Sequence, residues 1–289
     1  MDIYAMVTDK IITLLENGVV PWRRPWTSTG LPRNLVSKKP YRGVNVFLLS
    51  ASKYVSPFWL TMRQANELGG HIRKGEESTA IVFWKIDDVK QSTEDLEAEE
   101  PEEKTRRRFL LRFYRVWNLE QVELPEPVRA RFQVQTQAID PIAEAERIIA
   151  EMPNPPAIEY HGSLAFYRPT TDTVVLPPRD SFLSPEGFYQ SIYHEILHSS
   201  GHPKRLARPG ITESIHFGSE RYSREELVSE LGAAFLCAAA GIDNATLDDH
   251  AAYLKGWLDA LKADKRAIVQ AAAQAQKAAD YILDRAASE

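Results

Sequence analysis

The sequence predicts an α+β protein with two domains, and three observations support this. The 289 residues are 44% hydrophobic, which is enough for a substantial core, and this length favours two domains. Short strand-like segments occur in both halves, whereas the longer helical patterns gather in the second half. A polar stretch with Pro125, Pro127 and Pro141 separates the two. We therefore expect domains at residues 1–128 and 142–289, a linker at 129–141, and a small sheet within a mostly helical second domain.

The first half should begin with a helix over residues 3–16, because apolar residues recur there at helical spacing and Gly18 ends the pattern. An irregular aromatic and basic stretch follows. Residues 79–86 and 109–117 are predicted strands. Between them, residues 87–104 hold nine Asp and Glu, so we expect a solvated, mobile hairpin loop. A surface that imitates DNA is the alternative for this loop, and its role stays open.

The second half should contain one short ribbon among helices. The predicted elements, in order, are a helix over 142–152, two strands at 164–169 and 173–177 joined by a turn, a helix that starts at Ser184 and Pro185 and stops before Gly201, a helix ending at Gly241, and two helices near 247–263 and 265–286. The ribbon is either a sheet edge that orients an extended peptide or an ordinary packed hairpin.

Residues 194–198 read His-Glu-Ile-Leu-His and predict a metal site. Side chains four residues apart on a helix point the same way, so His194 and His198 can chelate one ion. Glu195 then lies beside that ion, where a carboxylate can take a proton from coordinated water, whose pKa zinc lowers to about 7. This is the zincin arrangement, with Glu195 as the catalytic residue.

A third protein ligand should follow downstream. Residues 224–232 resemble the third-ligand helix of thermolysin-like zincins, which implies that Glu226 binds the metal and Glu230 hydrogen-bonds a ligand histidine, although the two could be exchanged. These acids could instead simply favour the first turn of a helix. Glu225 points about 100° away from Glu226, so we expect it to be solvated. We interpret His202 as a residue at the rim of the site rather than a ligand, because Gly201 and Pro203 interrupt the helix.

Charge divides the chain. Residues 1–85 contain 12 Lys and Arg against 6 Asp and Glu, whereas the remainder contains 23 against 34, which gives the net charge of −5. This asymmetry suggests nucleic acid as a partner of the N-terminal part. No run approaches the roughly 18 apolar residues of a membrane span and no signal peptide is recognisable, so we expect a cytoplasmic protein with no membrane partner. The single cysteine, Cys237, lies among apolar residues and should pack in the core.

Aromatic rings alternate with cations in the basic part, which is the pattern of single-stranded nucleic-acid binding: bases stack on rings while cations meet phosphates. Tryptophans in a small domain are as often core residues. The predicted DNA-binding residues are Trp22, Arg23, Arg24, Trp26, Lys38, Lys39, Tyr41, Arg42, Asn45, Trp59, Arg63, Gln64, Arg73 and Lys74.

With both halves considered, the chain resembles the ArdC-like antirestriction proteins and the related N-terminal regions of TraC-type primases. The resemblance covers nearly the whole chain and rests on long strings. They include Pro40-Tyr41-Arg42-Gly43-Val44-Asn45, Trp117-Asn118-Leu119-Glu120-Gln121, Tyr193-His194-Glu195, Ser200-Gly201-His202-Pro203 and Arg224-Glu225-Glu226-Leu227-Val228.

The resemblance implies an N-terminal domain that binds single-stranded DNA and a zincin-like metallopeptidase domain with zinc or another divalent metal such as manganese. It also implies a role in protecting incoming conjugative DNA from host restriction, in the recipient cell after transfer. A protein substrate, within the host restriction system, would be the target of the metal site. The alternative is a non-enzymatic protein that coats single-stranded DNA and whose metal only stabilises the fold.

Overall fold

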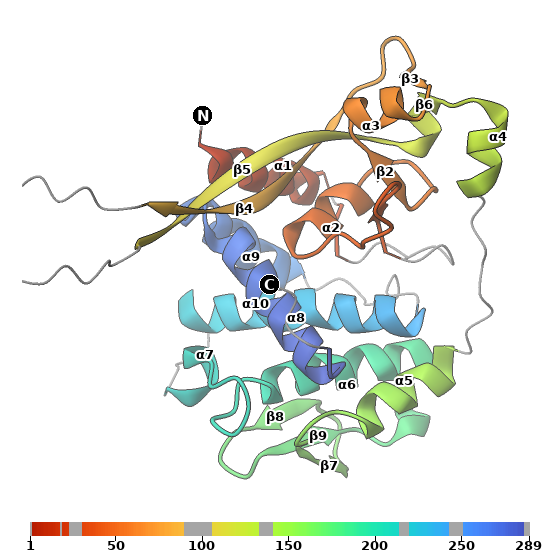
Figure 1. Cartoon of the computed structure of the whole chain (residues 1–289). Coiled ribbons are helices and arrows are strands. Elements are labelled where there is room, and N and C mark those ends of the chain that lie inside the picture. Colours follow the sequence, from red (N-terminus) through yellow and green to blue (C-terminus); the bar gives the residue numbers. More distant parts are fainter. Residues whose placement is uncertain are drawn as a thin grey trace, which may run out of the picture.

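The computed structural model describes residues 2–17, 19–22, 31–89, 106–132, 141–213, 220–242 and 251–285. It confirms the α+β class, with a sheet and helices in the upper half of Figure 1 and helices over a three-stranded sheet in the lower half. None of the helices within these residues is long and apolar enough to cross a membrane.

The N-terminal half is built around a four-stranded sheet in the order β1-β2-β5-β4. Its elements are α1 (Ile3–Glu16), β1 (Arg33–Asn34), α2 (Val44–Ser50), β2 (Phe58–Leu60), α3 (Met62–Glu67), β3 (His71–Ile72), β4 (Thr79–Val89), β5 (Arg106–Asn118) and β6 (Val122–Glu123). The predicted strands are confirmed as β4 and β5, which pair antiparallel from Thr79 opposite Val116 outward. Residues 90–105, and with them most of the acidic loop, lie outside the described residues.

The C-terminal half carries the predicted helices and ribbon. Helix α4 (Glu126–Arg129) still lies with the N-terminal elements, beside β6 in Figure 1. The C-terminal elements are α5 (Pro141–Ala150), β7 (Ala157–Tyr160), β8 (Phe166–Arg168), β9 (Thr173–Leu176), α6 (Pro185–Ser199), α7 (Pro209–Thr212), α8 (Glu220–Ala240), α9 (Ala251–Ala263) and α10 (Ala267–Ile282). Short 3₁₀ turns occupy Leu119–Gln121, Ala130–Phe132 and Arg179–Ser181. Strand β9 lies between β7 and β8, which makes β8 an edge strand.

Helix α6 begins where the sequence predicts it. The Ser184 hydroxyl accepts a hydrogen bond from the Gly187 N–H, and Pro185 occupies the first turn, where its missing N–H costs nothing. Helix α8 packs closely against α6 because position 232 is glycine: a Cβ there would lie 2.4 Å from Leu197 Cδ1. This close approach brings the histidine helix and the glutamate helix together.

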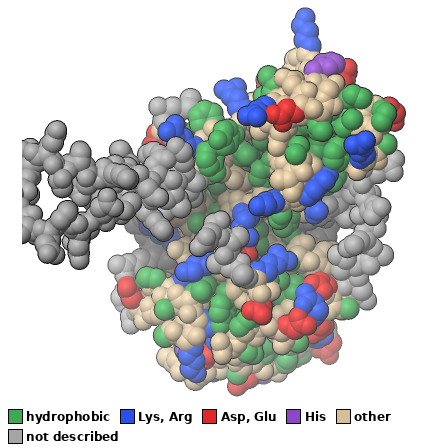
Figure 2. All heavy atoms as spheres, in the orientation of Figure 1, with side chains coloured by type: hydrophobic (Ala, Val, Ile, Leu, Met, Phe, Trp, Pro, Cys, Tyr) green, Lys and Arg blue, Asp and Glu red, His purple; other side chains and the backbone are tan. Residues whose placement is uncertain are grey.

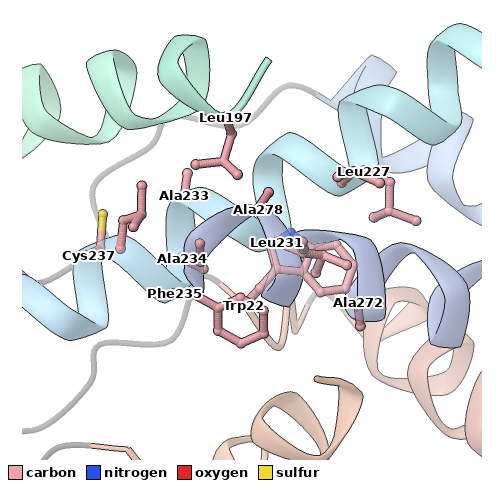
Figure 3. Close-up of a cluster of buried hydrophobic side chains, with 14 of the residues drawn as sticks. Trp22, Leu197, Leu227, Leu231, Ala233, Ala234, Phe235, Cys237, Ala272 and Ala278 are labelled. Carbon is pink, nitrogen blue, oxygen red and sulfur yellow. The ribbon is translucent and has the colours of Figure 1, made fainter. Parts of the chain in front are cut away.

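One core joins the two halves. The Trp22 ring contacts Phe47 of α2 and Trp257 of α9 edge-on, with centroids 6.2 and 5.4 Å away, and it belongs to the same buried cluster as Leu231 and Phe235 of α8. Figure 3 shows this cluster between α8 and its neighbours, with Cys237 inside it as expected. Helices α1 and α2 therefore pack directly on the C-terminal helices.

Candidate metal centre

Three of the predicted ligands converge between α6 and α8. His194 Nε2 lies 3.1 Å from His198 Nε2 and 3.3 Å from a Glu226 carboxylate oxygen, and His198 Nε2 lies 3.4 Å from the other oxygen of Glu226. Ligand atoms about 2.0–2.1 Å from a tetrahedral metal stand roughly 3.3 Å apart. All three residues are largely buried, and the spacing of their atoms fits a divalent ion. Among the described residues, this is the group whose geometry suits a metal.

Behind the ligands, polar side chains hold His198 in place. The Ser229 hydroxyl lies 3.0 Å from His198 Nδ1, and a Glu225 carboxylate oxygen lies 3.6 Å from the same nitrogen. Arg208 donates to both oxygens of Glu225 and to the carbonyl of Leu197, one residue before His198. These contacts fix which ring nitrogen faces the metal position, as partners behind metal ligands commonly do.

Glu225 corrects one expectation. It is 6% exposed rather than solvated, because the segment leading into α7 covers that face of α8 and supplies Arg208 as its partner. Gly210 of α7 lies so close that a Cβ there would be 2.6 Å from the Glu225 carboxylate. The helix angle gave the direction of the side chain correctly, but only the fold reveals what meets it there.

Of the two residues predicted to lie around the ligands, Glu230 lies beside His194 and His202 lies farther away. A Glu230 oxygen lies 3.9 Å from His194 Nδ1, on the side of the ring away from Glu226. His202 lies outside the ligand group, and its Nδ1 is 3.8 Å from Asp172. Asp172 in turn pairs with the almost fully buried Arg205 and accepts a hydrogen bond from the Tyr167 hydroxyl. His202 thus belongs to a polar network beside the site.

The charges of the site depend on one another. Burial alone would lower the pKa of both imidazoles, but the Glu226 carboxylate raises the pKa of His194, and Glu225 and Glu226 raise that of His198 to about 10. Burial alone would raise the pKa of Glu226, yet its hydrogen bonds with the two histidines hold it well below its ordinary value. Without a metal, this group therefore binds protons in the place where a cation would sit.

A cleft of about 400 Å³ opens in front of these ligands. Glu195 lines it together with the three ligands, and residues 165–167 at the start of edge strand β8 line it as well. Glu195 is 8% exposed, so it is shielded from bulk water yet faces the cleft. Tyr222, four residues before Glu226 on α8, also lines the cleft, and sequence patterns gave no reason to select it.

The predicted DNA-binding residues that the structure describes are partly buried and partly exposed. Arg23, Arg24 and Trp26 lie outside the described residues. Trp22 and Trp59 are 1% and 2% exposed, so both rings pack in the core rather than on the surface where a base could reach them. Asn45 uses its amide to pair with the backbone N–H and carbonyl of Val82.

The remaining predicted residues lie near the surface in several places. Gln64 caps α3, Tyr41 is partly buried, and Arg42 pairs with Asp280 of α10. The exposed cations among the described members of the set are Lys38, Lys39, Arg42, Arg63, Arg73 and Lys74. Figure 2 shows Lys and Arg side chains on this face from the tip of the upper half to the boundary with the lower half.

Comparison with known proteins matches two family models to separate parts of the chain. Residues 1–117 match the family described as the N-terminal domain of anti-restriction factor ArdC, and residues 143–274 match the zincin-like metallopeptidases. The crystal structure of metal-free antirestriction protein ArdC from plasmid R388 superposes with a TM-score of 0.76 at 34% identity, covering 98% of this chain and 97% of that one. The chain belongs to the ArdC family. The Mn(II)-bound ArdC structure from R388 is similar in the same way, with a TM-score of 0.75, 35% identity and coverage of 100% and 99%.

Two other relatives show how the ArdC-like unit is used. Protein y4eC of Sinorhizobium fredii is 36% identical over 97% of this chain and 91% of its own length. DNA primase TraC of Escherichia coli is 33% identical over 97% of this chain, but the match spans only 27% of the primase. A manganese-bound relative and the ligand geometry together support a divalent metal in this ArdC protein.

Proposed function

We propose that this chain is an antirestriction protein that binds single-stranded DNA through its N-terminal half, residues 1–128, and hydrolyses a protein substrate at the metal site of residues 142–289. It would thereby protect conjugative DNA from restriction in the recipient cell. The observation that carries the proposal is that His194, His198 and Glu226 converge while Glu195 lines the cleft in front of them. Two imidazoles and one carboxylate are a set that catalytic zinc sites use, and we propose zinc as the metal, with manganese as the alternative that the R388 relative supports.

The residues around the cleft suit peptide hydrolysis. A bound divalent ion supplies Lewis acidity at this position. Glu195 is placed to accept a proton on its carboxylate and to return it to the leaving amine. Among the described strands, β8 pairs with β9 alone, so an extended peptide could add to the other side of β8, beside Glu195. His198, held by Ser229 and Glu225, keeps its Nε2 toward the metal position.

Replacing Glu195 by Gln tests the catalytic part, because it removes the proton acceptor and leaves the metal ligands. We expect the Glu195→Gln protein to retain one divalent ion per chain, measured by elemental analysis, and to lose protection of a restriction-sensitive plasmid during transfer. Glu186→Gln, an acid in the first turn of the same helix, is the matched control. Full protection by Glu195→Gln would show that catalysis is not needed and would favour a protein that only coats DNA.

A further inference from the structure

A second cavity lies between the two halves, and none of its lining residues lines the metal cleft. It has a volume of about 620 Å³, and its walls come from Arg42–Val44 beside and within α2, from β4 and β5, and from α10 with the residues that follow it. Val82, Leu111 and Val269 give it apolar walls. A space of this size is typical of sites that hold a small ligand or one nucleotide.

The mouth of this cavity is positively charged. Arg42, Lys277 and Arg285 line it against one carboxylate, Asp280, which is 6% exposed and already pairs with Arg42. Lys277 and Arg285 are exposed. The N-terminal and C-terminal walls are also tied together, since the Gly43 N–H donates to the side chain of Gln276. An apolar interior with a cationic mouth suits a ligand that has a flat apolar part and an anionic part.

An exposed ring continues from the cavity along the hairpin. Phe83 lines the cavity and stacks on Tyr114, with centroids 4.4 Å apart and planes 8° from parallel. Tyr114 is 55% exposed, which is unusual for so large a ring. Arg112 is the cross-strand partner of Phe83, and it is exposed. Because side chains alternate along a strand, Phe83, Arg112 and Tyr114 share one face of the hairpin, and Phe83 connects this face to the cavity.

We propose that the cavity holds one nucleotide of a single DNA strand. Its base would lie against the apolar walls, and the phosphates on either side would pair with Arg42, Lys277 and Arg285. The neighbouring base would stack on Tyr114. This inference rests on the proposed binding of single-stranded DNA and gives it a location. Because Lys277 and Arg285 belong to the C-terminal half, the strand contacts both halves, and binding is not confined to residues 1–128.

The test measures binding of fluorescein-labelled oligothymidylate to the full-length protein by anisotropy at several salt concentrations. Lys277→Gln should lower the slope of log affinity against log salt by about 0.7, the value for one phosphate contact to a single strand. Tyr114→Ala should weaken binding by about 5- to 150-fold, since it removes one stacked base, whereas Tyr114→Phe keeps the ring. Lys255→Gln on α9 is the matched control, because Lys255 is exposed but does not line the cavity.

Equal thermal midpoints of the variants would exclude unfolding as the cause of lost binding. The inference requires both effects, with Lys255→Gln and Tyr114→Phe binding like the wild type. If the wild type binds the oligonucleotide and either Lys277→Gln or Tyr114→Ala is unchanged, the location is wrong and the proposed DNA binding stands. If the wild type does not bind, the DNA-binding part of the proposed function fails, and this inference fails with it.

Discussion

Replacing Arg208 by Ala should destabilise the protein more than almost any other single change near the metal site. The Arg208 guanidinium is 5% exposed and makes four hydrogen bonds. Two reach the Glu225 carboxylate at 2.5 and 3.2 Å, one reaches the Ser200 hydroxyl at 2.6 Å, and one reaches the Leu197 carbonyl at 2.7 Å. The side chain therefore ties the end of α6 to α8 directly behind His198.

The expected loss follows from the burial of the partner. Removing one side of a buried ion pair costs about 3–5 kcal/mol of unfolding free energy, because the other charge stays buried with less compensation. Here Glu225 would keep only His198, 3.6 Å away, as a charged partner among the described residues. At about 2–4 °C per kcal/mol for a chain of this size, the thermal midpoint should fall by roughly 6–20 °C. Burial alone would raise the pKa of Glu225, but hydrogen bonds with His198 and Arg208 lower it. Without Arg208 that pKa rises, so protonation at acid pH can neutralise Glu225, and the difference from the wild type should shrink as pH falls.

Urea unfolding of the metal-free protein gives the free energies for a double-mutant cycle. Arg208→Ala combined with Glu225→Ala should cost at least about 1 kcal/mol less than the sum of the single changes, since the double variant leaves no unpaired charge. A loss below about 1 kcal/mol for Arg208→Ala, or strictly additive losses, would refute the view that this pair stabilises the site.

Three further predictions concern the site and the core. Because the pKa of His194 is raised and that of His198 reaches about 10, a metal ion must displace protons when it binds at neutral pH. The affinity for the metal should therefore fall as pH drops from about 8 to about 6, and calorimetry in two buffers should detect the released protons. A metal affinity that does not change with pH would contradict this prediction. Ser229→Ala should weaken metal binding by about 10- to 100-fold, while Ser191→Ala on α6 should leave it unchanged. Trp22→Ala should cost about 3–5 kcal/mol in urea unfolding, and a change below about 1 kcal/mol would show that the ring is not a core residue.

The sequence predicted the parts of the fold that depend on neighbouring residues. Helical spacing and the caps at Ser184 and Gly241 located α6 and the end of α8, and the predicted strands at 79–86 and 109–117 correspond to β4 and β5. The convergence of His194, His198 and Glu226 was also predictable, because one turn of helix brings the two histidines together and a known pattern indicates Glu226. Short elements were missed: α2 and β7 have too few residues for a period to be visible, and contacts with distant segments stabilise them.

Long-range partners were beyond the sequence. Nothing in the spacing of Arg208 and Glu225, 17 residues apart, indicates that they meet behind His198. Trp22 and Trp59 were expected at the surface but are buried. A ring next to arginine or phenylalanine in the sequence has no local feature that distinguishes stacking on a base from packing in a core. Tyr114 was overlooked because a strand pattern explained it fully, and only its exposure marks it as unusual.

The packing of α8 bears on how the two halves act together. One side of this helix places Glu226 against the histidines of α6, and another side packs on α10, which carries Lys277 and Asp280 at the mouth of the cavity. Trp22 and Phe47 from the N-terminal half close the same core. Close-packed interiors transmit displacement, because they cannot absorb it in empty space. A DNA strand bound across Arg42 and Lys277 would therefore contact elements that pack against the helices of the metal site. A DNA-binding domain joined only by a linker would have no such contact. The proposed DNA site and the metal site then belong to one packed core, so DNA binding can affect the geometry of the metal ligands.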